Sequence, residues 1–225
     1  MFSLNEALEC VNMPVIYEYA LMDCYNQSHR HYHNVDHIKE MLKHVPTDHN
    51  ECEIIIDAIL FHDLVYLNYP VPTGLNESLS VAEYIFYNSK AIVFNTPFAA
   101  NPGDGESVEY ERRVIEAITA TSRHLEDQRH LGDVSKLVLD LDLSTFALPW
   151  DEYVIWKDKI EKENNEIYGK TATADEILCG RYLFLEQLLK RKQLYYIKTE
   201  WENLARDNLR KDMLICLEIL DRTKG

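Results

Sequence analysis

The chain has 225 residues, 46% of them hydrophobic, which is enough to bury the core of one substantial domain or two small ones. Its 38 acidic residues outnumber its 23 basic residues, and the resulting net charge of -15 repels phosphate backbones and anionic membrane surfaces at long range. Nucleic acids and membranes are therefore poor candidates as partners. A small anion is not excluded, because a pocket responds to the charges nearest to it.

The five cysteines are odd in number and widely spaced, and no two of them form a CxxC motif, so we expect reduced and mostly buried thiols. No apolar run approaches the roughly 18 residues of a membrane span. The N-terminus, MFSLNEALEC, lacks the basic and apolar regions of a signal peptide. We therefore expect a soluble protein of the cytoplasm.

Apolar residues recur along most of the chain at helical spacing rather than in alternation, which predicts an all-α fold. Typical helix lengths give about nine or ten helices, which we expect to form a single domain over residues 1–225. Glycine and proline gather in YPVPTG (69–74) and NTPFAANPGDG (95–105), which we interpret as loops.

Three S/T-x-x-E patterns predict helix starts, because the hydroxyl and carboxylate of such a capping box satisfy N–H groups that the first helical turn leaves free. These patterns run from Ser3 to Glu6, from Thr173 to Glu176 and from Thr199 to Glu202. We expect helices to begin beside them.

The first stretch with chemical character is RHYHNVDHI, residues 30–38, which holds three of the nine histidines. Six of the nine lie between His29 and His49, so the enrichment is real. A cluster of this kind forms an exposed polar turn as readily as a metal site. Its interpretation therefore depends on other parts of the chain.

The second stretch is CEIIIDAILFHDLVY, residues 52–66, which is apolar on nearly every side before it presents His62 and Asp63. A helix this apolar is buried, and a buried charged pair is costly unless it is compensated. A divalent cation compensates it well, because imidazole and carboxylate are both good ligands for first-row metals. The alternative is a core histidine hydrogen-bonded to its neighbour.

Two further stretches place polar groups among apolar residues. VIEAITATSRH puts His124 at the end of an amphipathic helix, and KLVLDLDLS sets Asp140 and Asp142 within a run of leucine and valine. The order of His33 or His37, then His62 and Asp63, then His124, then Asp142 is informative, because side chains from four helices can converge on one pocket.

This order on a helical chain resembles the HD superfamily of metal-dependent phosphohydrolases. Seven ordered blocks resemble one branch of predicted phosphohydrolases of about this length: RHYHNVDHI, AILFHDLVY, NESLSV, ITATSRH, LDLDLS, GRYLFLEQLL and ARDNL. The resemblance implies an HD-type helical bundle, with a metal-site core at about 25–145 and additional C-terminal helices at about 150–225. One block departs from the branch, which has an acid-aromatic pair where this chain reads ENN, residues 163–165.

Carried over residue by residue, the resemblance implies four metal ligands. They are His37, His62, Asp63 and Asp142, with His33 as the alternative for the first position. The ion would be divalent, and the ligand types suit Mn²⁺, Fe²⁺, Mg²⁺, Zn²⁺ or Ni²⁺ without choosing among them.

The resemblance also implies how such a site works on a small phosphorylated substrate, a nucleotide or another phosphomonoester. Glu77 or Asp63 would take a proton from the attacking water, and Arg30, His33 and His124 would hold the phosphoryl group. Tyr66 would contact a base or sugar.

Three other functions stay open at the level of sequence. A two-iron site with similar ligands supports oxygenase chemistry in some HD proteins. A non-catalytic nucleotide-binding module and a helical interaction protein with internally satisfied polar groups are the other two. The substrate, the number of metal ions and the oligomeric state do not follow from the sequence.

Overall fold

The structure is a computed structural model that describes residues 1–68, 72, 74–93 and 105–223. Within these ranges the chain forms ten α-helices and two short 3-10 helices, and no strand occurs. The all-α prediction is therefore confirmed. The two predicted loops, 69–74 and 95–105, lie largely outside the described residues.

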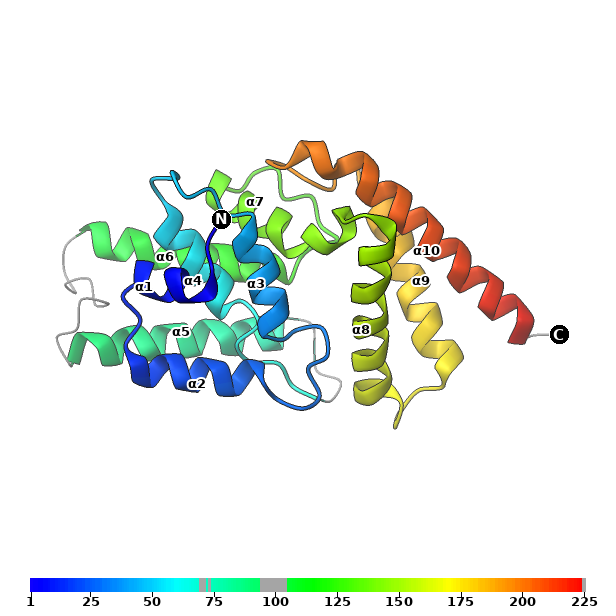
Figure 1. Cartoon of the computed structure of the whole chain (residues 1–225), viewed down its shortest axis with the longest axis horizontal. Helices are drawn as coiled ribbons and strands as arrows, with labels where there is room; N and C mark the ends of the chain where they lie inside the picture. Colours follow the sequence, from blue (N-terminus) through cyan, green and yellow to red (C-terminus); the bar gives the residue numbers. More distant parts are fainter. Residues whose placement is uncertain (69–71, 73, 94–104, 224–225) are drawn as a thin grey trace.

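Figure 1 shows the arrangement of the helices. In chain order they are α1 (Leu4–Cys10), α2 (Val15–Tyr25), α3 (Val35–Lys43), α4 (Cys52–Phe61), α5 (Leu75–Val93), α6 (Gly105–Thr121), α7 (Asp133–Asp142), η1 (Ser144–Ala147), α8 (Trp150–Tyr168), α9 (Ala174–Lys190), η2 (Thr199–Trp201) and α10 (Glu202–Thr223).

Helix α4 lies at the centre of the N-terminal part of the molecule, in contact with α3, α5, α6 and α7 (Figure 1). Every residue from Ile54 to Phe61 is buried, as expected for a helix that is apolar on all sides. The hydrophobic core around α4 includes Ala7 and Leu8 of α1 and Leu21 of α2. The first two helices are therefore part of the same core as α4.

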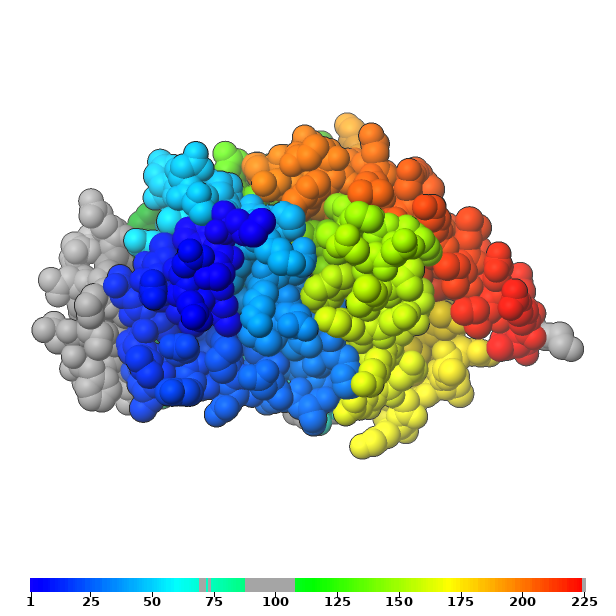
Figure 2. Space-filling view, in the orientation of Figure 1, coloured from blue at the N-terminus to red at the C-terminus, as the bar shows by residue number. Residues whose placement is uncertain are grey.

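A second core cluster lies in the C-terminal part, where α10 packs along α9 (Figure 1). Its buried members include Leu185 and Leu188 of α9 together with Leu209 of α10. Trp201, in η2, packs against both core clusters. On the face shown in Figure 2, the residues of α3 and the segment before it, in light blue, lie against α8, in yellow-green. The boundary between a core at 25–145 and an extension at 150–225 stays a prediction.

Two of the three predicted capping boxes form. The side chains of Ser3 and Thr173 each accept a hydrogen bond from the backbone of the glutamate three residues later, and that glutamate accepts in return from the cap. At Thr199 a helix begins as predicted, since η2 starts there and α10 at Glu202, but the capping box does not form. Residues 199–201 form a 3-10 turn, and the carboxylate of Glu202 accepts from the backbone N–H groups of Leu194 and Tyr195 instead.

Over the described residues, no helix combines the length and the apolar composition that a membrane crossing requires. The cysteines of this part of the chain are free thiols, and two of them, Cys10 and Cys52, have their sulfur atoms 3.8 Å apart.

Candidate metal centre

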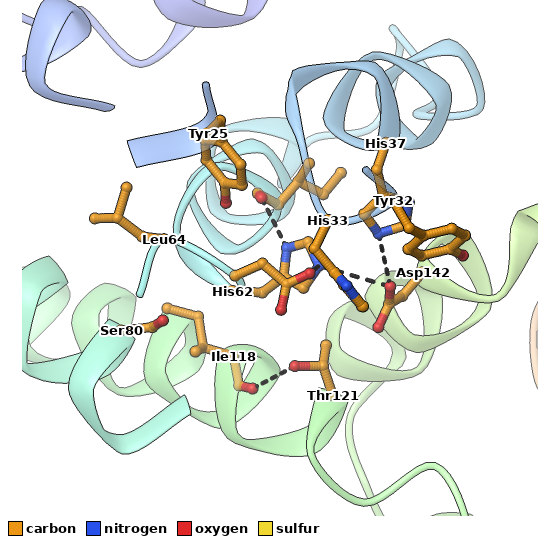
Figure 3. Close-up of polar contacts among 12 residues, drawn as sticks. Tyr25, Tyr32, His33, His37, His62, Leu64, Ser80, Ile118, Thr121 and Asp142 are labelled. Atoms are coloured by element: carbon orange, nitrogen blue, oxygen red, sulfur yellow. Dashed lines mark hydrogen bonds and ion pairs between the residues drawn. The ribbon is translucent and has the colours of Figure 1, made fainter. Parts of the chain in front are cut away.

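Four of the side chains singled out in the sequence meet where α3, α4 and α7 converge. His37 lies on α3, His62 and Asp63 directly follow α4, and Asp142 is the last residue of α7. Figure 3 shows the rings of His37 and His62 directed toward Asp142. The coordinating atoms of His37, His62 and Asp63 all lie within 4.8 Å of one another.

Three distances among these atoms are those of neighbouring ligands around one small ion, although Asp142 is not part of the group that lies within 4.8 Å. Nε2 of His62 lies 3.0 Å from Oδ2 of Asp63 and 3.6 Å from Oδ1 of Asp142, and Nε2 of His37 lies 2.9 Å from the same Asp142 oxygen. Ligands at about 2.0–2.2 Å from a transition metal are separated by roughly 3.0–3.5 Å in octahedral or tetrahedral geometry.

His62 gives the strongest indication that a cation belongs here. Its Nδ1 lies 2.9 Å from the backbone carbonyl oxygen of Ile59, which can only accept, so Nδ1 carries a proton. In a neutral ring, Nε2 then presents a lone pair to two carboxylates. This atom is buried and has no hydrogen-bond partner among the described residues. A lone pair that faces two carboxylates is unfavourable, so Nε2 of His62 needs either a second proton or a metal ion between it and the carboxylates.

The fit to a divalent ion is therefore good. Two imidazoles and two carboxylates form a ligand set that suits the first-row divalent metals. The hydrogen bond from His62 to the Ile59 carbonyl is the kind of outer contact that fixes the tautomer of a metal-binding histidine. The residues that would hold the ion are those implied by the resemblance, with His37 in the first position. Their role as ligands stays a prediction.

The charges of this cluster stabilise one another. Burial alone would raise the pKa of Asp142, but the imidazoles of His62, His124 and His37 hold it well below its usual value. Burial likewise opposes the charged form of His62, yet the carboxylates of Asp63 and Asp142 raise its pKa well above the ordinary value. His124 completes the cluster, with Nε2 2.7 Å from Oδ2 of Asp142.

His33 takes a different position from His37. Its Nδ1 makes a very short contact with a carboxylate oxygen of Glu163 on α8, and Glu163 also accepts hydrogen bonds from the backbone N–H groups of Tyr32 and His33. Although burial opposes protonation, Glu163 and the nearby aspartates raise the pKa of His33 to about 9. This geometry favours His37 over His33 as the first ligand, and makes His33 a cation beside the site.

Arg30 is buried, and its donors are directed to the protein itself. The guanidinium donates to the backbone oxygens of Asp63, at 2.6 Å, and Leu64, at 2.8 Å, and to the side chain of Gln27. Arg30 therefore holds the segment that follows α4 in place. Its contacts favour a structural role over the predicted contact with a phosphate.

Tyr66 and Glu77 also lie near the site without touching the ligands. The ring of Tyr66 stacks on His33, with centroids 4.4 Å apart. Burial raises the pKa of Glu77, and the charge of Asp63 adds to this effect. The side chain of Glu77 makes no hydrogen bond with another described residue. Its predicted role as proton acceptor, and the predicted role of Tyr66 in substrate binding, stay predictions.

A cavity of about 510 Å³ opens beside the cluster. His33, His124 and Asp142 line it, together with residues of α8 and α9, whereas His37, His62 and Asp63 do not. Neither Arg30, Tyr66 nor Glu77 lines this cavity. Its size is typical of a pocket for a small molecule.

No protein-family model matches this sequence, and no curated protein is significantly similar to it. The chemical interpretation of the site therefore depends on its own geometry.

Glu163 is the site residue that the sequence prediction missed. It lies in the ENN block, which was noted only as a departure from the family pattern, and it is fully buried between α8 and the histidine segment. No signal in the sequence marks Glu163, because it is one of several acids on a mostly polar helix and its partner histidine lies 130 residues earlier in the chain.

Proposed function

We propose that this chain is a metal-dependent phosphohydrolase of the HD superfamily that acts on a small phosphorylated molecule. The single observation that carries the proposal is the convergence of His37, His62, Asp63 and Asp142, the last of which lines a cavity of small-molecule size. The predicted ligands are brought together, and the open space beside them is lined by the additional histidines.

A divalent ion bound by these four residues would lower the pKa of a water molecule and offset the negative charge of a phosphate oxygen. The protein residues have complementary tasks. His33 and His124 both line the cavity. His33 can donate a hydrogen bond to a phosphoryl oxygen, whereas Nε2 of His124 lies against Asp142 and its Nδ1 is buried, so His124 acts on the site through Asp142. Asp63 or Glu77 would accept the proton of the attacking water.

Glu163 acts on the reaction through His33. Its carboxylate keeps the imidazole protonated and orients it by a contact at Nδ1, which leaves Nε2 as the donor for the substrate. We expect Glu163 to be a positioning residue.

The proposal is tested by assaying hydrolysis of a panel of phosphomonoesters and nucleotides in the presence of Mn²⁺, Fe²⁺, Mg²⁺, Zn²⁺ or Ni²⁺. The key variant is Asp63→Asn, which removes one ligand charge with little change of shape. The matched control is Asp57→Asn, a buried aspartate on α4 whose contact is with Tyr110. We expect activity to fall by about 100-fold or more in Asp63→Asn and to persist in Asp57→Asn. Full activity in a folded Asp63→Asn protein would refute the proposal.

A further inference from the structure

The cavity extends well beyond the histidines. Besides His33, His124 and Asp142, its lining includes many residues of α8 and α9, among them Lys157 and Arg181. A phosphoryl group held at the histidines would fill only part of this volume. The remaining space must accommodate another part of the bound molecule.

The walls of this space are formed by large apolar and aromatic side chains. Tyr153, Trp156 and Ile160 recur along one face of α8, and Ile177 and Phe184 lie one above the other on the facing side of α9. All but Tyr153 are only partly buried by the protein itself. Side chains of this kind bind flat aromatic groups by stacking and by removing apolar surface from water.

The part of the cavity lined by Lys157 and Arg181 offers hydrogen-bond donors without a net positive charge. Lys157 is paired with Glu161 at 2.6 Å, and Arg181 forms a very short ion pair with the buried Asp212. Nη1 of Arg181 makes no hydrogen bond with any residue that the structure describes. Because two acids offset the two cations, this part suits neutral acceptor atoms, such as carbonyl or ring nitrogen atoms, better than a second anionic group.

We propose that the cavity between α8 and α9 binds the organic part of the substrate, and that this part is a flat aromatic body with hydrogen-bond acceptors at its distal end. The substrate is then a phosphomonoester with one anionic end, rather than a small alkyl phosphate or a molecule with anions at both ends. The inference rests on the proposed function, because that function places the phosphate at the histidines.

Gly180 provides a way to test the inference. It lines the cavity on α9, and a Cβ atom at this position would meet no other part of the fold within 4 Å. A larger side chain at this position extends into the cavity without displacing the protein. Gly180→Leu also replaces glycine in a helix interior by a good helix former, so it does not weaken α9.

The experiment is a calorimetric titration with 1-naphthyl phosphate and with methyl phosphate, in the presence of Mn²⁺. Three proteins are compared: the unmodified chain, Gly180→Leu and the control Cys179→Leu, which places the same side chain at a neighbouring exposed position that does not line the cavity. We expect the unmodified chain and the control to bind the naphthyl ester about tenfold more tightly or better, and Gly180→Leu to lose most of this preference. Ile177→Trp obstructs the same space from one turn earlier and serves as the second variant.

Equal binding of the two esters by the unmodified chain, no binding of either, or a preference that survives both obstructing variants would overturn the inference. Hydrolysis of the two esters is measured in parallel. If Gly180→Leu abolishes the preference for the naphthyl ester but neither ester is hydrolysed, the aromatic binding site is supported. The proposed phosphohydrolase function is then refuted.

Discussion

The pair formed by His33 and Glu163 makes a prediction at the scale of single residues. Although burial opposes protonation, Glu163 and the nearby aspartates raise the pKa of His33 from 6.5 to about 9. The stabilisation that His33 gains from these charges is therefore fully present below pH 6.5 and is lost as the pH rises through 9. The pKa of Glu163 is lowered from 4.5 to about 2, despite burial, by His33 and two backbone N–H groups. The stabilisation that ionised Glu163 gives to the folded protein is therefore fully present above pH 4.5 and is lost as the pH falls toward 2.

We expect the free energy of unfolding of the metal-free protein to fall between pH 6.5 and 9, by at most about 3 kcal/mol. In Glu163→Gln this fall should be smaller, because the largest charge that raises the pKa of His33 is absent. Urea unfolding at several pH values, with a chelator present, measures the effect.

The matched control is Glu166→Gln, which removes the partner of His31 one turn further along α8, where the carboxylate is about half exposed. This variant should keep the pH dependence of the unmodified protein. If Glu163→Gln and Glu166→Gln give the same profile as the unmodified protein, the buried pair does not contribute as described.

Residues differ in how well the sequence predicts their place. His62 and Asp63 could be placed because they follow a helix that must be buried, and Asp142 because it ends an apolar run. Arg30 and Glu163 could not, because their partners are set by tertiary contacts. The partners of Arg30 are the backbone oxygens 33 and 34 residues later, and no spacing rule predicts them.

At the scale of the helix, the capping patterns show how local and tertiary interactions compete. The S/T-x-x-E pattern forms a cap at Ser3 and at Thr173, where the glutamate has no stronger partner. At Thr199 the same pattern fails, because Glu202 accepts from Leu194 and Tyr195 and pairs with Arg206 at 2.6 Å. A glutamate with three such partners is not available to a threonine hydroxyl.

This difference gives a direct comparison of two threonines. Thr173→Ala removes the hydroxyl that accepts from the backbone of Glu176 and should lower the free energy of unfolding by about 1 kcal/mol. Thr199→Ala should cost less than about 0.5 kcal/mol, since no side-chain cap forms there. Urea unfolding of the two variants tests this. Equal losses would mean that the third box forms in solution.

Helix α8 connects the fold to the site. Glu163 reaches the histidine segment, Trp156 lies edge-on to Tyr32 with ring centroids 5.6 Å apart, and Lys159 lies 3.3 Å from Asp36. From the sequence, residues after about 150 are expected to extend the core. The structure shows that this helix forms both a wall of the cavity and the support of His33.

At the scale of the whole molecule, the site lies where the two core clusters meet. The cluster around α4 fixes His62 and Asp63, and the C-terminal cluster begins at Leu143, directly after Asp142. The segment before α3, the end of α7 and helices α8 and α9 thus contribute to one cavity. The periodicity of apolar residues predicts the helices, but it carries no information about which helix faces meet, so the cavity could not be predicted.

The central claim is that four side chains hold a divalent ion, and metal content is its most direct test. The measurement is elemental analysis of the purified protein after incubation with Mn²⁺ or Fe²⁺, beside Asp63→Asn and Asp57→Asn, with helical content checked by circular dichroism. Asp57 is a suitable control because burial raises its pKa to about 7, so its neutral form is accessible and asparagine replaces it at little cost. We expect about one equivalent or more of metal in the unmodified protein and in Asp57→Asn, and a large loss in a folded Asp63→Asn. The absence of metal from all three folded proteins would contradict the claim that these side chains hold a divalent ion, and would also refute the proposed hydrolase function.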